Sequence, residues 1–379
     1  MNMAKTVRVL HVLGMLNLGG AESRIMDLYR QIDKNRVQFD FLIHTNKECY
    51  FDKEVIEMGG RIFRVPPFRV YNILEYCREM RSFFAEHNEF AVVQGHMTST
   101  AGIYLPIAKR FGIKITIAHA RSAGVDKNIK GWITRILRIG LHKKADICFT
   151  CSELAGISVF GKRAYKSGKV KFLPNAINAV KYRYDNSVRQ EVRSELNVHG
   201  RLVIGHVGSF RYAKNHEFLI KVFAEILKVS KKEEWSEQPL LVMLGEGELM
   251  ESIKKQVENL GIYNHVMFLG NKRDAWRYYQ AFDYVVFPSW YEGMPGTIVE
   301  AQTAGLRCLI SERISKDVIF TDLVKQMDLE AEPEKWARYV IDNIQYQRKD
   351  YYELAQSAGF DIVGQAEKML KFYETGCFE

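Results

Sequence analysis

Long apolar runs are missing from this 379-residue chain. No window approaches the roughly 20 apolar residues that a membrane-spanning helix needs, and Met1 to Arg8 lack the sustained apolar stretch of a signal peptide. The composition also excludes collagen and low-complexity disorder, because 47% of the residues are hydrophobic and only 8 are proline. We therefore expect a folded, unexported protein of the cytoplasm.

Cysteines are few and widely separated. The six of them fit a reducing compartment better than a disulfide framework. Cys148 and Cys151 are spaced like a metal or redox pair, but they fall in a strand-like segment, where an odd separation points two side chains to opposite faces. We interpret them as ordinary thiols, and we expect no metal site.

The net charge of +9 is unevenly distributed. Residues 1–180 carry 28 Lys and Arg against 15 Asp and Glu, a balance of +13, and the remainder carries 26 against 30, a balance of −4. A basic first half indicates an anionic partner: a membrane surface, a phosphorylated lipid or nucleic acid. No nucleic-acid-binding module or aromatic-basic signature is present, which argues against nucleic acid.

Short apolar segments of strand character alternate with amphipathic helical segments along the chain. The expected strands are residues 7–13, 39–44, 61–65, 91–94, 114–119 and 146–151, then 201–207, 239–244, 265–269, 283–287 and 307–310. Helical patterns such as 73–86, 101–111, 216–230 and 249–260 lie between them. The alternation predicts βαβ units on parallel sheets, in two tandem domains joined near residues 176–200.

Glycine-bearing turns follow the first strand of each half, at the strand ends where such sheets bind ligands. Gly19 and Gly20 would let the backbone approach a phosphate or an acceptor closely, although a plain tight turn is the alternative. The turn lacks the Gly-x-Gly-x-x-Gly pattern of dinucleotide folds, which disfavours a dehydrogenase. In the second half, Arg211 and Lys214 precede a helix and predict a diphosphate clamp, unless they are solvated surface cations. Glu246, between two glycines, could meet a ribose or base, or cap a turn.

The most informative stretch runs from Pro288 to Gly305. Glu292 and Glu300 are eight positions apart and bracket a transition from strand to loop to helix. If the helix starts near Gly296, the amides of Gly296 and Thr297 are available for phosphate oxygens, and the two carboxylates can accept hydrogen bonds from sugar and ribose hydroxyls. A capped surface helix is the alternative that spacing alone leaves open.

This stretch resembles the Glu-x7-Glu signature of glycosyltransferase family 4, which comprises retaining enzymes of the GT-B fold. Further motifs match in the same order over nearly the whole chain: Gly19-Gly20-Ala21-Glu22, Val93 to Met97, Ile117 to Ala120, Leu173 to Asn178, Lys214-Asn-His216, Phe268-Leu-Gly270 and Glu334 to Ala337. The chain most resembles the bacterial exopolysaccharide and capsule branch of the family.

The resemblance implies an α/β protein with two Rossmann-like domains facing across a cleft. The first would be an acceptor-binding domain of residues 1–178 plus a C-terminal helix, 359–379, which crosses back to it. The second, residues 179–358, would bind the nucleotide sugar. The apolar spacing of Ile362, Ala366, Met369, Leu370 and Tyr373 supports one buried face on that last helix.

The resemblance also implies roles for particular residues. Glu292 would bind the donor sugar, Glu300 the ribose, Lys214 the diphosphate, and the turn of Leu269, Gly270 and Asn271 the base. His119 would line the reacting face, so that the expected catalytic residues are His119, Glu292 and Lys214. The remaining donor-side residues are Gly19, Gly20, Ser209, Arg211, Glu246, Gly293, Met294, Gly296 and Thr297, and the acceptor-side residues are His96 and Arg121.

Two departures from the family pattern affect these roles. Many relatives carry Arg where this chain has Ser209, which leaves Arg211 as the candidate for the second diphosphate cation. The histidine segments read Gln94-Gly-His96 and Ala118-His-Ala-Arg121 instead of the common His-Ser-His versions, which indicates weaker polar contacts to the acceptor or a different acceptor.

The expected activity is retaining transfer of a sugar from a UDP-linked donor to a lipid-linked saccharide or other glycan, without a metal or other cofactor. The Asp-x-Asp pattern of metal-dependent transferases of the other common fold does not occur in the sequence. A sugar-nucleotide epimerase of the same fold and a non-catalytic sugar-nucleotide-binding protein are the alternatives.

One basic, apolar stretch, residues 127–144, could bring the protein to a membrane. Trp132, Ile133, Ile136, Leu137 and Ile139 alternate with cations, as in helices that lie in an anionic membrane interface. A helix with its apolar side in the protein core and its charges in water is the alternative.

Overall fold

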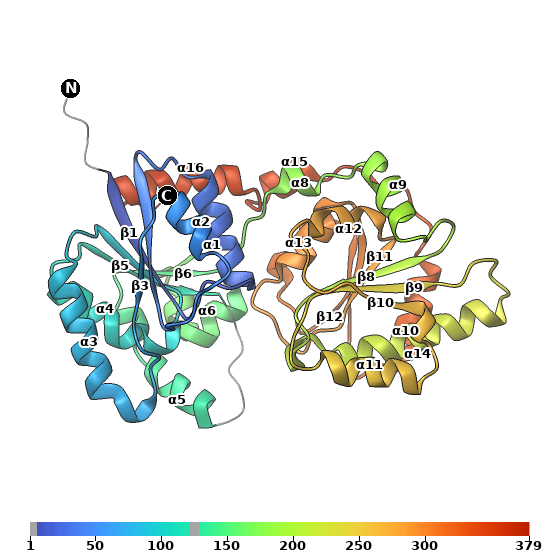
Figure 1. The fold of residues 1–379 in the computed structure, drawn as a ribbon, viewed down its shortest axis with the longest axis horizontal. Helices are drawn as coiled ribbons and strands as arrows, with labels where there is room; N and C mark the ends of the chain where they lie inside the picture. Colours follow the sequence, from blue (N-terminus) through green and yellow to red (C-terminus); the bar gives the residue numbers. More distant parts are fainter. Residues whose placement is uncertain (1–5, 122–128, 379) are drawn as a thin grey trace. The chain divides into compact units, whose positions relative to one another are not determined.

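The computed structural model describes residues 6–121 and 129–378, which form two compact units (Figure 1). One unit consists of the chain up to Ala176 together with the chain from Ile362 onward, and the other of Ile177–Asp361. The boundaries expected from the sequence, 178 and 358, lie two and three residues from these. Each unit is an α/β structure built on one parallel sheet, as the alternating pattern predicts.

The first unit contains a seven-stranded sheet in the order β3-β2-β1-β4-β5-β6-β7. Every strand pair is parallel. Its strands are β1 (Val7–Leu13), β2 (Val37–Ile43), β3 (Ile62–Arg64), β4 (Val92–Gly95), β5 (Ile115–Ala120), β6 (Ile147–Thr150) and β7 (Val170–Phe172). Most of these strands are buried along their length, because helices cover both faces of a parallel sheet.

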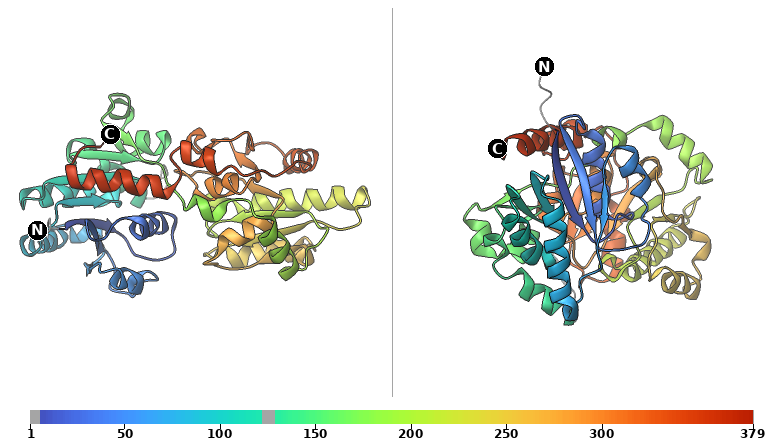
Figure 2. Two further views of the ribbon diagram at one scale, coloured as in Figure 1. Left: turned by 90° about the horizontal axis from the view of Figure 1, so that it is seen from above. Right: turned by 60° about the vertical axis from the view of Figure 1, so that its left-hand side comes forward.

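The helices of the first unit lie on both faces of this sheet (Figure 1). They are α1 (Gly20–Gln31), α2 (Asp52–Glu57), α3 (Ile73–Glu86), α4 (Thr98–Arg110), α5 (Ile129–Arg138), α6 (Glu153–Phe160), α7 (Lys162–Lys166) and α16 (Ile362–Thr375), with the 3-10 turns η1 (Val70–Asn72) and η2 (Leu141–Lys143). Helix α16 packs on α1, β1 and β2. In Figure 2 it is the red helix near the C-terminus, beside the blue N-terminal elements. It buries Ile362, Ala366, Met369, Phe372 and Tyr373 in the core of this unit.

The second unit contains a six-stranded parallel sheet in the order β10-β9-β8-β11-β12-β13. The strands are β8 (Val203–Val207), β9 (Leu240–Leu244), β10 (Val266–Phe268), β11 (Tyr284–Phe287), β12 (Arg307–Ser311) and β13 (Val324–Met327). The helices are α8 (Ala179–Tyr182), α9 (Asn186–Glu195), α10 (His216–Lys232), α11 (Met250–Asn259), α12 (Ala275–Ala281), α13 (Gly296–Thr303), α14 (Pro333–Asp342) and α15 (Tyr352–Ser357), with η3 (Tyr212–Lys214), η4 (Tyr263–His265) and η5 (Lys316–Val318).

The polar stretch after residue 180 belongs to the second unit and does not form a plain linker. It contains α9, whose N-terminus is capped by the Asp185 side chain and which packs on α12. Arg189 and Arg193 of α9 both pair with Asp283, which precedes β11. Ion pairs therefore hold α9 on the second unit, although the polar composition of this segment is typical of a linker.

In both sheets the strand order reverses beside the first strand, between β1 and β4 and between β8 and β11. Ligands of open α/β sheets bind outside the carboxyl ends of the strands at such a reversal. The loops after these four strands and the start of α13 carry most of the residues predicted to be functional. The others lie at the end of β5 and in the loops after β9 and β10. Within residues 6–121 and 129–378, no helix is long and apolar enough to cross a membrane.

Candidate active site

Three loops meet at the carboxyl edge of the second sheet, after β8, β9 and β10. The amide of Phe210 donates to the Glu246 carbonyl at 3.0 Å, and that of Gly245 to the Gly270 carbonyl at 2.9 Å. Gly245 has a φ of +131°, and a Cβ there would stand 2.2 Å from the carbonyl oxygen of Gly208, so this approach requires glycine. The structure thus brings together the predicted residues Ser209, Glu246, Leu269, Gly270 and Asn271.

Polar side chains of these loops are accessible. Asn271 Nδ2 donates a hydrogen bond of 3.0 Å to Glu246 Oε2, and both side chains are exposed. Arg211, in the loop after β8, is exposed as well. A carboxylate, an amide and a guanidinium in accessible loops at this edge are suited to bind hydroxyl and phosphate groups.

Lys214, at the end of η3, is held by an ion pair. Its Nζ lies 2.7 Å from Glu292 Oε1, and the two side chains are only 16% and 17% exposed. The ammonium also lies 4.6 Å from the ring centre of Phe287, the last residue of β11, in a cation–π contact. The two residues predicted to contact a ligand therefore hold each other in place, in the loops after the neighbouring strands β8 and β11.

Helix α13 begins at Gly296, as expected from the sequence. Its first amides, those of Gly296 and Thr297, have no acceptor within the helix, because a helix leaves its first N–H groups unpaired. The Thr297 hydroxyl donates to the Val207 carbonyl at 3.0 Å, which ties the start of the helix to the end of β8. Gly293 and Met294 lead into it and are buried. The partly positive helix end thus lies where the strand order reverses.

Glu300 lies in the second turn of α13 and is 6% exposed. The hydroxyl of Tyr279, on α12, donates a hydrogen bond of 2.7 Å to its Oε2. Burial, reinforced by the charge of Glu300, holds the pKa of Tyr279 well above its usual range, so the phenol stays protonated and remains a donor. This partner was not predicted from the sequence.

Three histidines gather at the carboxyl edge of the first sheet: His11 of β1, His96 after β4 and His119 of β5. His11 and His119 are buried and His96 is partly buried. His11 Nδ1 lies 3.0 Å from His96 Nε2, and the ring centres of His96 and His119 are 5.3 Å apart. The predicted residues His96 and His119 are therefore neighbours.

Arg121 joins this cluster from the end of β5. Its Nε donates to His96 Nδ1 at 3.1 Å, and its Nη1 to Asn175 Oδ1 at 2.8 Å. In the described parts of the chain it forms no ion pair with a carboxylate. Burial lowers the pKa of Arg121 to about 10, so the guanidinium stays cationic at neutral pH.

His119 is linked to the C-terminal helix through one side chain. Gln94 Nε2 lies 3.0 Å from His119 Nδ1, and the Tyr373 hydroxyl donates to Gln94 Oε1 at 2.6 Å. Burial, with the nearby Arg121 cation, lowers the pKa of His11 to about 3 and holds that of His119 well below its usual range. Both imidazoles are consequently neutral at pH 7.

The predicted residues thus form two groups, one in each unit. Gly19, Gly20, His96, His119 and Arg121 belong to the first unit, where Gly20 begins α1, and all the others belong to the second. Sequence reasoning missed the buried polar partners: His11, Gln94 and Tyr373 in the first unit, and Tyr279 in the second. For His11 the sequence did offer a signal, because a polar residue at a buried position of a core strand usually has a polar partner.

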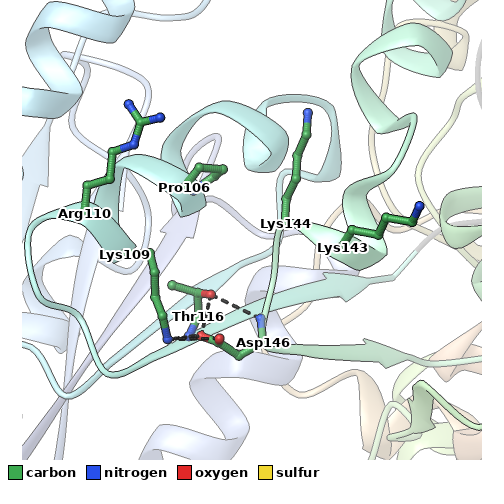
Figure 3. A pocket seen from close by; sticks show the side chains of 7 residues that line it. All are labelled: Pro106, Lys109, Arg110, Thr116, Lys143, Lys144 and Asp146. Atoms are coloured by element: carbon green, nitrogen blue, oxygen red, sulfur yellow. Dashed lines mark hydrogen bonds and ion pairs between the residues drawn. The ribbon is translucent and has the colours of Figure 1, made fainter.

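The first unit also has a basic hollow, apart from its histidine cluster, at the amino ends of β5 and β6 (Figure 3). Its volume is about 380 Å³, and its lining residues are Pro106, Lys109, Arg110, Thr116, Lys143, Lys144 and Asp146. Lys109 Nζ and Thr116 Oγ1 both bond Asp146, at 2.9 and 2.8 Å. The carboxylate is thus already paired, and the hollow lies at the sheet edge opposite the predicted site. Among the described residues, no group of three or more His, Cys, Asp or Glu side chains is arranged to hold a metal ion.

Both halves of the chain match known glycosyltransferase families. The family description "Glycosyltransferase Family 4" matches residues 18–181, and "Glycosyl transferases group 1" matches residues 188–358. Together these matches cover most of both units.

Individual relatives agree with this assignment. A Bacillus subtilis (strain 168) protein named as the glycosyltransferase EpsF is 33% identical over 88% of this chain and 86% of its own length. The capsular polysaccharide biosynthesis glycosyltransferase CapH of Staphylococcus aureus is 23% identical over 97% of this chain and 98% of its own. The Escherichia coli UDP-Gal:alpha-D-GlcNAc-diphosphoundecaprenol alpha-1,3-galactosyltransferase is 24% identical over 80% and 79%, respectively.

Solved structures show the same fold. Anabaena Alr3699/HepE, crystallised with UDP and glucose, superposes with a TM-score of 0.75 over 97% of this chain and 100% of its own, at 16% identity. The predicted GT-B architecture, with two parallel-sheet units, is thereby confirmed.

Proposed function

The chain belongs to glycosyltransferase family 4, with a group 1 glycosyltransferase domain in its second half, and on this basis we propose that it transfers a sugar with retention from a UDP-linked donor to a lipid-linked saccharide. The proposed pathway is the synthesis of a bacterial exopolysaccharide or capsule. The similar protein HepE is solved with UDP and glucose, and the E. coli relative is named for a UDP-sugar donor and a diphosphoundecaprenol-linked acceptor.

The observation that carries this proposal is the pairing of Lys214 with Glu292 near the start of α13. A cation and free helix amides at one sheet edge can meet the negative charge of a diphosphate, and a carboxylate beside them can accept hydrogen bonds from the sugar. Glu300 would receive the ribose hydroxyls. In this assignment Arg211 supplies the second cation, in place of the one that is absent at Ser209.

The proposed reaction breaks the bond between the sugar C1 and the diphosphate oxygen and forms a bond from C1 to an acceptor hydroxyl oxygen. The acceptor attacks from the face that the diphosphate leaves, and its proton passes to the departing oxygen, which gives retention. Lys214, Arg211 and the α13 amides stabilise the developing charge without a metal ion. Glu292 orients the sugar, and neutral His119 donates a hydrogen bond to the reacting group.

His96 and Arg121 are the proposed acceptor-side residues. Arg121 is a cation that forms no ion pair with a carboxylate within residues 6–121 and 129–378, so an incoming phosphate would supply the missing charge partner. A diphosphate-linked acceptor, such as the one in the name of the E. coli relative, carries that group.

The donor is tested by thermal unfolding with a panel of nucleotide sugars. We expect UDP and one UDP-sugar to raise Tm, by the linkage of binding to folding, and GDP-sugars not to do so. Product analysis with that UDP-sugar, a diphospholipid-linked acceptor and EDTA should then show an acceptor-dependent product with the anomeric configuration of the donor.

Other outcomes separate the alternatives. Conversion of the sugar nucleotide without an acceptor would identify an epimerase, and stabilisation without turnover of any acceptor would indicate a binding protein. Complete loss of activity with EDTA, or an inverted product, would overturn the metal-free or the retaining part of the proposal.

We also propose that the first unit docks on an anionic membrane surface through α5. Trp132 and Ile136 of α5 are 68% and 51% exposed, and Ile139, which directly follows the helix, is 70% exposed, so this apolar side does not face the core of the unit. Arg135 is exposed beside them, whereas Arg138 is half-buried and donates from Nε to Thr98 Oγ1 at 3.0 Å. Residues 127 and 128 of the predicted stretch lie outside the described residues.

A second exposed apolar cluster supports this surface. Val70, Tyr71, Ile73 and Leu74 are exposed around η1 and the start of α3. Helices α3 and α5 both pack on α4, and Arg138 of α5 donates to Thr98 in the first turn of α4. Both clusters therefore lie on or beside helices that pack on α4, in the connections that follow β3 and β5 of the first sheet.

We expect the combined substitution of Trp132 and Ile136 by Ser to abolish flotation with anionic liposomes at low salt, because each lost side chain contributes buried apolar area at the interface. Arg135→Gln should weaken binding to anionic liposomes and should make that binding less sensitive to salt. Ile56→Ser, which changes an isoleucine that is 64% exposed on α2, is the matched control. Wild-type protein that does not float, or equal loss with the control, would rule this surface out.

A further inference from the structure

We propose that Gln94 and Tyr373 are positioning residues, which hold His119 in the tautomer that carries its proton on Nε2. The inference rests on the proposed function only in taking His119 as the group that meets the reacting atoms. It gives the C-terminal helix α16 a part in the site, in addition to its packing in the core.

Distances fix the direction of the hydrogen bonds. The contact of 2.6 Å between Tyr373 and Gln94 is in the range of O–H···O bonds and shorter than N–H···O bonds usually are. The hydroxyl therefore faces the amide oxygen, and the amide nitrogen faces His119. An amide nitrogen can only donate, so His119 Nδ1, at 3.0 Å, must be the acceptor. The remaining proton of a neutral imidazole then lies on Nε2.

His119 Nε2 is buried and has no hydrogen-bond partner among the described residues. A buried N–H without an acceptor is costly, and such groups in native proteins usually have a functional explanation. A hydroxyl or a departing phosphate oxygen could accept this bond. The network thus produces a preorganised donor.

Within residues 6–121 and 129–378, Gln94 is the one hydrogen-bond partner of His119 Nδ1, so it sets the tautomer there. The rings of Phe149 on β6 and of His96 after β4 contact His119. Arg121 acts on it through its charge, as His11 would if it were protonated. His96 and His11 are fixed separately: Arg121 can only donate to His96 Nδ1, which makes His96 Nε2 the donor to His11 Nδ1. Among the residues that the structure describes, no carboxylate acts on His119, so none of them competes for its Nδ1.

The tautomer can be read directly, without substrate. We expect long-range 1H–15N correlation spectra of histidine-labelled protein at pH 7.5 to show His119, assigned from the signal missing in His119→Gln, as the neutral Nε2–H form. In Tyr373→Phe, Gln94 is free to turn, and the Nδ1–H form should appear. Tyr29→Phe is the matched control, because Tyr29 is a buried tyrosine of the same core whose hydroxyl also bonds a glutamine, Gln38, at 2.8 Å.

Kinetics should follow the spectra. We expect Tyr373→Phe to lower kcat by about fivefold, the worth of one neutral hydrogen bond, with little change in the KM for the donor. Tyr29→Phe should leave kcat unchanged. An Nδ1–H or a doubly protonated His119 in the wild type, or a Tyr373→Phe spectrum equal to that of the wild type, would overturn the inference whether or not the protein is a transferase.

Gln94→Glu provides a second test with a defined sign. The new carboxylate would accept a hydrogen bond from Nδ1–H of His119 and would raise the pKa of the imidazole. Protonated His119 then still presents Nε2–H to the reacting group. When the imidazolium loses a proton, the carboxylate keeps the proton on Nδ1, so Nε2 is no longer a donor. We expect activity in Gln94→Glu to fall as pH rises through the new pKa, whereas the wild type shows no such limb. A variant pH profile that parallels the wild type would contradict the assigned role of Gln94.

Discussion

Replacing Lys214 by Met is expected to lower kcat/KM for the donor by roughly 10- to 150-fold, the equivalent of about 1.5–3 kcal/mol for a charge-assisted hydrogen bond. The substitution removes the cation proposed to meet the departing diphosphate. It also leaves the Glu292 carboxylate, now 2.7 Å from Nζ, without its partner at the place where negative charge develops. Steady-state kinetics with the identified UDP-sugar measures the effect.

Two variants in the same loop serve as comparisons. Ser209→Ala removes at most a neutral contact, worth about 1 kcal/mol or roughly fivefold in rate. Arg211→Met shows whether this exposed guanidinium supplies the second cation, in which case its loss should approach that of Lys214. An effect of Lys214→Met no larger than that of Ser209→Ala would show that Lys214 does not contact the diphosphate.

Replacing Glu292 by Ala should separate catalysis from nucleotide binding. We expect kcat to fall by roughly 10- to 150-fold, because the contact proposed to orient the sugar is charge-assisted. The Kd for UDP should stay the same or decrease, since Lys214 is released from its ion pair and becomes available to the diphosphate. Titration calorimetry with UDP and turnover measurements on the same preparation test both halves of this expectation.

The double variant of Lys214 and Glu292 checks whether the two act as one unit. Residues in direct contact give non-additive effects, so we expect the double variant to lose less activity than the product of the two single losses. Full activity in Glu292→Ala, or weakened UDP binding in that variant, would contradict the proposed division of roles.

The sequence predicted the backbone of this protein well, because its signals are local. Strand β1, helix α3 and the start of α13 at Gly296 have the expected positions, since alternating apolar runs and glycine turns report on the immediate neighbourhood. The edge strands β7 and β13 were missed. They are short and carry few buried residues, so they leave little pattern to detect.

The partners of the site residues could not be predicted, because they depend on distant parts of the chain. Tyr373 and Gln94 are 279 positions apart, and their contact exists only because α16 returns to the first sheet. The ion pair of Lys214 and Glu292 likewise depends on the tertiary structure, because it joins the loops that follow the neighbouring strands β8 and β11. The outward apolar side of α5 was one of two open alternatives, since periodicity defines a face and not what it contacts.

The return of α16 to the first unit has a consequence for biosynthesis. Residues that complete the core of that unit, from Ile362 to Tyr373, leave the ribosome only after the whole of the second unit has been made. The nascent first unit therefore exposes the apolar surface of α1, β1 and β2 that α16 later covers, during the translation of some 185 residues. Exposed apolar surface attracts chaperones and promotes aggregation, so we expect the nascent first unit to be most exposed to both until its last helix is made.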